Sequence, residues 1–176
     1  MTRTRISRLL CVCLLVVGPV SAVAEPAEGI ATLSADKVRG LKAGAGLGYA
    51  RAADLNGWPG PVHVLEMKDA LSLSAAQLRK MTMLHGEMTA RAKPLGRELI
   101  DAERALNRLF ATGTPSAADI EAATARAAAI EGRLRAVHLV THLRAAPLLT
   151  RHQTMLYVRA RGASGRKGHG GDGPGG

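Results

Sequence analysis

The sequence predicts an all-α protein built on a long, bent antiparallel helical hairpin with shorter flanking helices. Two stretches with helical spacing of apolar residues, 77–110 and 117–145, are separated by a short turn around Gly113. A short connection of this kind makes two successive helices antiparallel neighbours. The chain is rich in Ala, Leu and Arg, and no segment has the two-residue alternation that is typical of a strand.

The N-terminus has the layout of an export signal. Three arginines within the first eight residues precede an apolar run at 9–17, and Ala22 and Ala24 provide small residues for cleavage. The alternative is an uncleaved membrane anchor. The length of the apolar run argues against it, because the run is shorter than the roughly 20 residues that a membrane span needs. We expect a signal peptide at 1–24, cleaved near Ala24, and a periplasmic helical domain at 25–161.

Composition narrows the function of the mature protein. Cys11 and Cys13 both lie in the signal, so no thiol remains for catalysis, a disulfide or metal binding. Removing the three signal arginines from the 24 basic residues leaves 21 against 14 acidic ones, a net charge of +7 that suits an anionic partner. Export, and a total of one Trp, one Phe and two Tyr for stacking on bases, argue against nucleic acid.

The first elements are short. Leu33-Ser34 is typical of a helix start, with Ser34 as the N-cap. Glycines follow at 44, 46 and 48, but no strand precedes them and no Gly-Lys-Ser/Thr comes after, so we interpret them as a turn or a place of close packing. The prolines and glycines of 56–61 predict another turn, and a short helix is expected at 62–71.

The first long helix begins with a capping box, because Ser74 is followed three residues later by Gln77. Its apolar positions step by three and four, and nine of the ten are apolar, with His85 as the exception. Pro94 removes one backbone donor, so we expect it to bend the helix without ending it. The ten positions are 78, 81, 85, 88, 92, 95, 99, 102, 106 and 109.

The second long helix begins after Ser116, which forms a cap-like pair with Asp119, and Pro147 ends it. Another capping box follows at Thr150 and Gln153 and predicts a last helix. The Gly-rich stretch 162–176 has little apolar surface to bury, and we expect it to be disordered.

No enzyme active site is recognisable, and no cofactor is required. The nucleophile motif Gly-x-Ser-x-Gly does not occur, and the His63-x-x-Glu66 pair lacks the second histidine of a zinc protease motif. Carboxylates on the long helices alternate with arginines, a pattern that is typical of a solvated helix face.

Three histidines and a methionine raise the hypothesis of a metal site. His138 and His142 are four residues apart, so they share one face of the second long helix. If the hairpin pairs about Gly113, facing residue numbers sum to about 226, which brings His85 and Met88 beside them. Imidazoles and a thioether could bind a divalent or cuprous ion. The alternative is that His85 is a satisfied histidine of the apolar seam and that His138 and His142 point outward.

Two pentapeptides of the LTxxQ type bracket the hairpin, and the chain thereby resembles the Spy/CpxP family of periplasmic proteins and its relatives, the periplasmic heavy-metal sensors and resistance proteins. Residues 56–61 and 94–96 look like segments of a bacterial subgroup of that family. The first pentapeptide has Ser in place of Thr, which keeps the capping chemistry. The motif residues are Leu73, Ser74, Gln77, Leu149, Thr150 and Gln153.

The resemblance implies an ATP-independent chaperone fold that works as a homodimer. Spy-like members hold unfolded or partly folded envelope proteins on a basic and apolar surface, whereas CpxP-like members damp a membrane stress sensor. Metal-sensing relatives use His and Met ligands. From the resemblance and the composition we expect an envelope-stress chaperone, with a heavy-metal sensor or resistance protein as the alternative.

Overall fold

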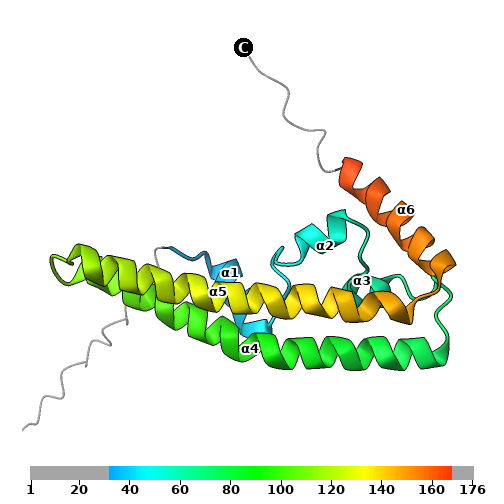
Figure 1. The fold of residues 1–176 in the computed structure, drawn as a ribbon, viewed down its shortest axis with the longest axis horizontal. Helices are drawn as coiled ribbons and strands as arrows, with labels where there is room; N and C mark the ends of the chain where they lie inside the picture. Colours follow the sequence, from blue (N-terminus) through cyan, green and yellow to red (C-terminus); the bar gives the residue numbers. More distant parts are fainter. Residues whose placement is uncertain (1–31, 168–176) are drawn as a thin grey trace, which may run out of the picture.

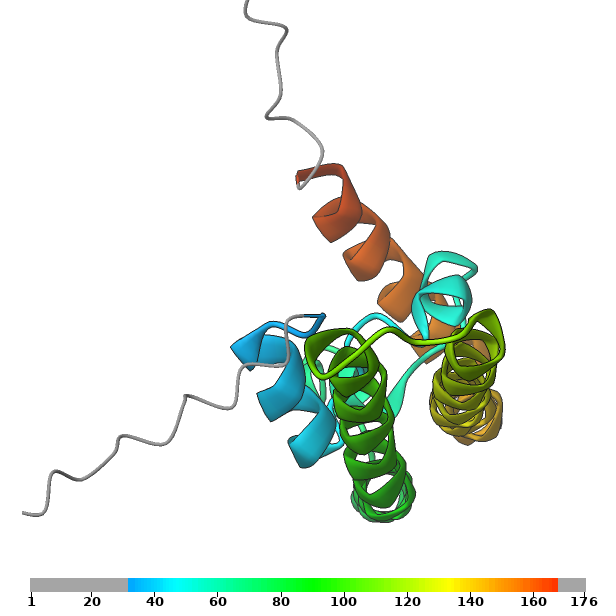
Figure 2. The same ribbon diagram turned by 90° about the vertical axis from the view of Figure 1, so that its left-hand side faces the viewer.

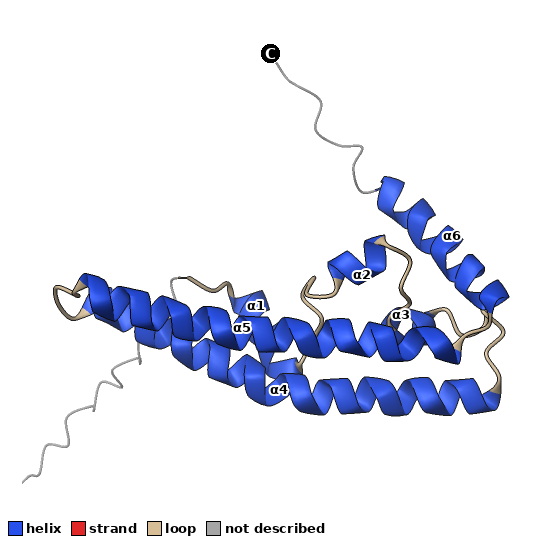
Figure 3. Cartoon of the chain, viewed as in Figure 1, coloured by secondary structure: helices blue, strands red, loops and turns tan. Residues whose placement is uncertain are grey.

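The computed structural model describes residues 32–167, and the side chains of residues 32–161. This part of the chain contains helices and turns and no strand (Figure 3), which confirms the predicted all-α class. The predicted signal peptide at 1–24 lies outside the described residues. The helices are α1 (Ala35–Ala43), α2 (Arg51–Leu55), α3 (Pro61–Glu66), α4 (Ala75–Ala111), α5 (Ala117–Ala145), the 3-10 turn η1 (Ala146–Leu148) and α6 (Arg151–Lys167).

Helices α4 and α5 form an antiparallel hairpin, and the views in Figures 1 and 2 agree that they lie side by side. Two ion pairs define their register: Arg133 to Glu98 at 2.6 Å and Arg144 to Glu87 at 2.7 Å. In both pairs the residue numbers sum to 231, so the expected sum of about 226 is wrong by more than one helical turn. The connection between Ala111 and Ala117 is centred beyond Gly113, which shifts the pairing in this direction.

Helix α4 continues through Pro94, as the unbroken apolar spacing predicts. Figure 1 shows α4 changing direction part-way along its length. The proline ring removes one backbone donor and crowds the preceding turn, which is a sufficient cause for a bend in a helix. Helix α4 packs against both α5 and α1.

The core consists of two groups of buried side chains along the hairpin. One lies toward the α4–α5 turn and includes Leu41, Leu99 and Leu134. The other lies toward the open end and includes Met81 and Tyr157. In the first group α1 packs closely on α4, because a Cβ added at Gly96 would lie 2.2 Å from the carbonyl oxygen of Leu41. Gly96 therefore permits an approach of backbone to helix that no larger residue allows.

Three elements differ from what the sequence predicts. α2 is a single helical turn that the sequence pattern did not predict, and α3 ends at Glu66, before the predicted end at residue 71. α6 continues past Gly162 to Lys167, into the stretch that we expected to be disordered. Figures 1 and 2 show α6 projecting away from the hairpin, with α2 nearby.

Candidate functional site

The two LTxxQ-type motifs bind each other. Gln77 donates from Nε2 to Oε1 of Gln153 at 2.8 Å, and Gln153 donates from Nε2 to Oε1 of Gln77 at 3.1 Å. Each glutamine also closes its own capping box, with Ser74 and with Thr150. The paired amides therefore join the first turns of α4 and α6, which are far apart in sequence.

The same amides satisfy backbone groups at the open end of the hairpin. Gln77 donates to the carbonyl of Leu148 at 2.9 Å, and Gln153 donates to the carbonyl of Leu71 at 3.1 Å. The two remaining motif residues, Leu73 and Leu149, belong to the core group at this end. Spacing predicts each capping box separately, but it carries no signal for the pairing between boxes, because that depends on how α6 folds back.

A cavity of about 310 Å³ lies beside α5, under the segment that carries α2 and α3. His138 and Met88 border it, and His138 is only 2% exposed. The His138 ring stacks on Tyr49, with 5.8 Å between ring centroids, and its Nε2 atom is buried without a hydrogen-bond partner. Burial, followed by the charge of nearby His142, holds the pKa of His138 below its usual value.

His142 borders the same cavity and is held in a fixed orientation. Its Nδ1 lies 2.9 Å from the carbonyl oxygen of Trp58, and because a carbonyl only accepts, Nδ1 carries the proton. Gly60 makes this possible, since a Cβ there would lie 2.5 Å from the imidazole Nε2 and Cε1 atoms. Neutral His142 therefore keeps an unprotonated Nε2.

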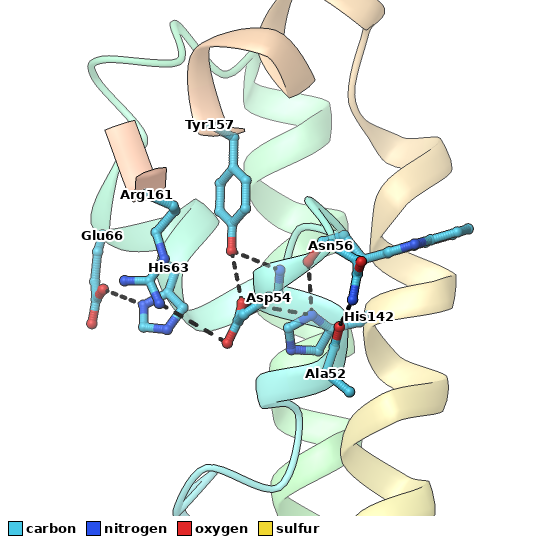
Figure 4. A network of polar contacts seen from close by, with 10 residues as sticks. Ala52, Asp54, Asn56, His63, Glu66, His142, Tyr157 and Arg161 are labelled. Atoms are coloured by element: carbon cyan, nitrogen blue, oxygen red, sulfur yellow. Dashed lines mark hydrogen bonds and ion pairs between the residues drawn. The ribbon is translucent and has the colours of Figure 1, made fainter. Parts of the chain in front are cut away.

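Asp54 connects α2 to α5 and α6, as Figure 4 shows. Its Oδ1 accepts a hydrogen bond from the hydroxyl of Tyr157 at 3.1 Å and lies 3.9 Å from Nδ1 of His142. Its other oxygen lies 4.0 Å from Arg161. The Tyr157 hydroxyl in turn accepts the backbone N–H of Gly60 at 3.3 Å, and burial raises the pKa of Tyr157 to about 12. The sequence pattern did not single out Asp54 or Tyr157.

The structure brings together three of the four predicted metal ligands. Met88, His138 and His142 border one cavity, whereas His85 does not, because the register places it about one turn beyond His142. His63 borders the cavity instead, and its Nδ1 lies 2.9 Å from Oε2 of Glu66, within hydrogen-bond distance. Within residues 32–161, no three His, Cys, Asp or Glu side chains are close enough to hold a metal ion as they stand.

The outer face of α5 carries a second apolar stripe. Leu143, Val140 and Trp58 are 58%, 45% and 44% exposed. Two grooves, of about 460 and 570 Å³, meet at Val140 and extend toward Trp58 and toward Pro94. We call this region the Val140 surface; it comprises Trp58, Pro94, Leu95, Val140 and Leu143, with Arg91 and Arg133 at one end.

Neither protein-family models, nor curated proteins, nor solved structures give a match to this chain. The helices in the described part of the chain include none with the length and apolar character that crossing a membrane requires. Two features of the described residues could bind a partner or ligand: the Val140 surface, and the cavity of about 310 Å³ beside His138 and His142, which we call the histidine cavity.

Proposed function

We propose that this protein is an ATP-independent periplasmic chaperone or envelope-stress protein that binds unfolded or partly folded polypeptides on its helical surface. The observation that supports the proposal is the exposed Val140 surface. An amphipathic helix normally buries its only apolar stripe, but α5 carries a buried stripe through Leu134 and His138 and a second, exposed one through Val140 and Leu143. Contiguous exposed apolar area of this kind marks interaction sites.

The chemistry of the surface suits a loosely defined client. Its apolar residues can cover exposed side chains of an unfolded chain, while Arg91 attracts acidic segments and speeds the encounter. None of these contacts requires a particular client sequence. The homodimer and the periplasmic location that the sequence predicts belong to the same proposal, as does a membrane stress sensor as a further partner.

Suppression of the light scattering of dithiothreitol-reduced insulin tests this proposal. The wild-type protein at equimolar ratio should slow aggregation, and Val140→Asp/Leu143→Asp should lose most of that effect, because two carboxylates interrupt the apolar stripe. Phe110→Asp is the control, since Phe110 is 60% exposed but lies at the C-terminal end of α4, away from Pro94 and the Val140 surface. Wild-type protein without effect, or a double variant as active as wild type, would contradict the proposal.

The second candidate function is metal sensing or resistance, which the histidine cavity favours. His138 presents a buried Nε2 without a hydrogen-bond partner. His142 donates a hydrogen bond from Nδ1 to the carbonyl oxygen of Trp58, as the second ring nitrogen of a metal-bound histidine usually does. Met88 adds a thioether, a ligand that favours cuprous ion. Since no three His, Cys, Asp or Glu side chains of the described residues converge as they stand, binding would need movement of the side chains that border the cavity.

Calorimetry with zinc, nickel, cobalt and cuprous ions tests this candidate. The expected result is heat of binding at micromolar metal that His138→Ala/His142→Ala removes and His85→Ala leaves unchanged. The His85 variant distinguishes the cavity from the site that the sequence alone predicts. Absence of heat with all four ions would exclude the metal-binding function.

A further inference from the structure

The outward face of α6 carries a shallow apolar hollow that is separate from the Val140 surface. It has a volume of about 560 Å³. Met155 and Val158 are 56% and 44% exposed there. The opposite face of α6 is the one that docks, through Gln153 and the fully buried Tyr157. The hollow is bordered by Leu149, Arg151, Thr154, Met155, Val158 and Arg159.

The charged side chains of α6 are all basic. Arg151 and Arg159 border the hollow, are exposed, and form no hydrogen bond or ion pair within the described part of the chain. Arg161 differs, because it faces Asp54 of α2. The sequence of α6 from Arg151 to Lys167 contains no Asp or Glu that could neutralise these arginines. The hollow therefore combines apolar contact area with uncompensated positive charge at both ends.

The spacing of the two arginines limits what fits. Eight residues along an α-helix correspond to about 12 Å. An extended peptide rises about 3.3 Å per residue, so carboxylates four residues apart are separated by about 13 Å. In such a peptide the residue midway between the carboxylates points to the same side as they do. A segment of the form acidic-x-apolar-x-acidic could therefore pair both arginines and place its apolar side chain on Met155.

We propose that this face of α6 docks an extended acidic segment of a partner protein, with the pattern acidic-x-apolar-x-acidic. Charge complementarity and the spacing of Arg151 and Arg159 favour this occupant. A flat anionic membrane would be attracted by the same charge, but it would not exploit a hollow bounded at both ends by arginines. The proposal goes beyond client binding, because it concerns another surface and a partner with a defined pattern.

A peptide titration tests the proposal on the purified protein. The probe is fluorescein-labelled Ser-Ala-Glu-Thr-Leu-Thr-Glu-Ala-Ser, and fluorescence anisotropy reports binding. We compare it with the same peptide carrying Lys in place of both Glu, and with one carrying Ser in place of Leu. The acidic peptide should bind at least about tenfold more tightly than either, because each lacks one of the two kinds of contact.

Charge reversal provides the decisive comparison. Arg151→Glu/Arg159→Glu should lose the acidic peptide and gain the lysine peptide. Arg91→Glu/Arg126→Glu, at two exposed arginines of α4 and α5, should leave both affinities unchanged. Circular dichroism checks that both variants keep their helices. The proposal is overturned by no saturable binding of the acidic peptide at millimolar concentration. It is equally overturned if Arg151→Glu/Arg159→Glu leaves the affinity for the acidic peptide unchanged. A protein that sediments with phosphatidylglycerol vesicles but does not bind the peptide would also overturn it. Suppression of insulin aggregation is measured separately for the Arg151→Glu/Arg159→Glu variant. A result against client binding and a result against peptide docking on α6 are therefore distinguishable.

Discussion

At the scale of single residues, Gln153 carries more contacts than its capping box implies. It is 8% exposed, and its Oε1 accepts a hydrogen bond from the backbone N–H of Thr150. Its Nε2 donates to Oε1 of Gln77 and to the carbonyl of Leu71. Gln153→Ala should lower the free energy of unfolding by about 2 kcal/mol, because buried polar groups on several elements lose their partner. Urea denaturation measures the change.

The neighbouring exposed residue offers a control for this prediction. His152→Ala should change the free energy of unfolding by less than about 0.5 kcal/mol, because His152 lies on the solvent side of the same helical turn. A double-mutant cycle between Gln77 and Gln153 isolates the pairing itself. If the two single effects simply add, the paired amides contribute nothing to stability beyond their separate caps.

The only two tyrosines of the chain should both resist ionisation. Burial raises the pKa of each to about 12, with Glu131 adding to the effect at Tyr49 and Asp54 at Tyr157. A raised tyrosine pKa means that the folded state holds the proton more tightly than the unfolded state. This contribution to stability is complete below pH 10 and is lost as the pH rises toward about 12.

Alkaline titration followed by ultraviolet absorbance checks the tyrosine prediction. The folded protein should show almost no tyrosinate at pH 10, and unfolding in urea should restore a normal titration. Tyr157→Phe should remove half of the delayed signal. A normal transition near pH 10 in the folded protein would show that at least one hydroxyl is not buried as described.

At the scale of helices, the contact between α1 and α4 should depend on Gly96. Gly96→Ala places a methyl group 2.2 Å from a backbone oxygen of α1, which neither backbone can accommodate without a shift. We expect a loss of about 1–3 kcal/mol in the free energy of unfolding, despite the better helix propensity of alanine. Chemical denaturation with a tryptophan fluorescence readout measures it.

Gly86→Ala is the matched control on the same helix. Nothing lies within 4 Å of an added Cβ at Gly86, so alanine should act only through its helix propensity. The expected result is a gain of up to about 1 kcal/mol. If Gly96→Ala stabilises the protein as well, α1 does not approach α4 as closely as the backbone distance implies.

At the scale of the whole molecule, the hairpin depends on the N-terminal elements. Leu41 and Tyr49 share one core group with Met88 and Leu99 of α4, and Val64 belongs to the other. A chain that begins at residue 68 would expose these apolar faces to water. It should unfold at a lower temperature and self-associate, because exposed apolar area of this extent drives association.

Circular dichroism and sedimentation velocity measure both effects of this truncation. A chain that ends at residue 161 is the control, since it keeps every residue of the two core groups. That control should melt at the temperature of the full chain. A monomeric, equally stable hairpin lacking α1 to α3 would show that the N-terminal elements are appended to the fold and do not complete its core.

The sequence alone determines where α1, α4, α5 and α6 begin, because capping residues and apolar spacing act within a few residues of one another. Ser74, Ser116 and Pro94 behave as their local chemistry predicts. The apolar spacing also places Met81, Met88 and Leu99 on the buried face of α4. Local signals cannot specify α2, whose single turn depends on contacts through Asp54 with α5 and α6.

Tertiary structure decides what lies opposite what. The observed register differs from the predicted one by little more than one helical turn, so His85 does not lie beside His138 and His142. His63 borders the cavity instead. The pairing of Gln77 with Gln153 and the exposure of Val140 are equally invisible in the sequence. The physical reason is common to all three: helix period and capping are local, whereas the alignment of two helices is set by the sum of many weak contacts along their whole length.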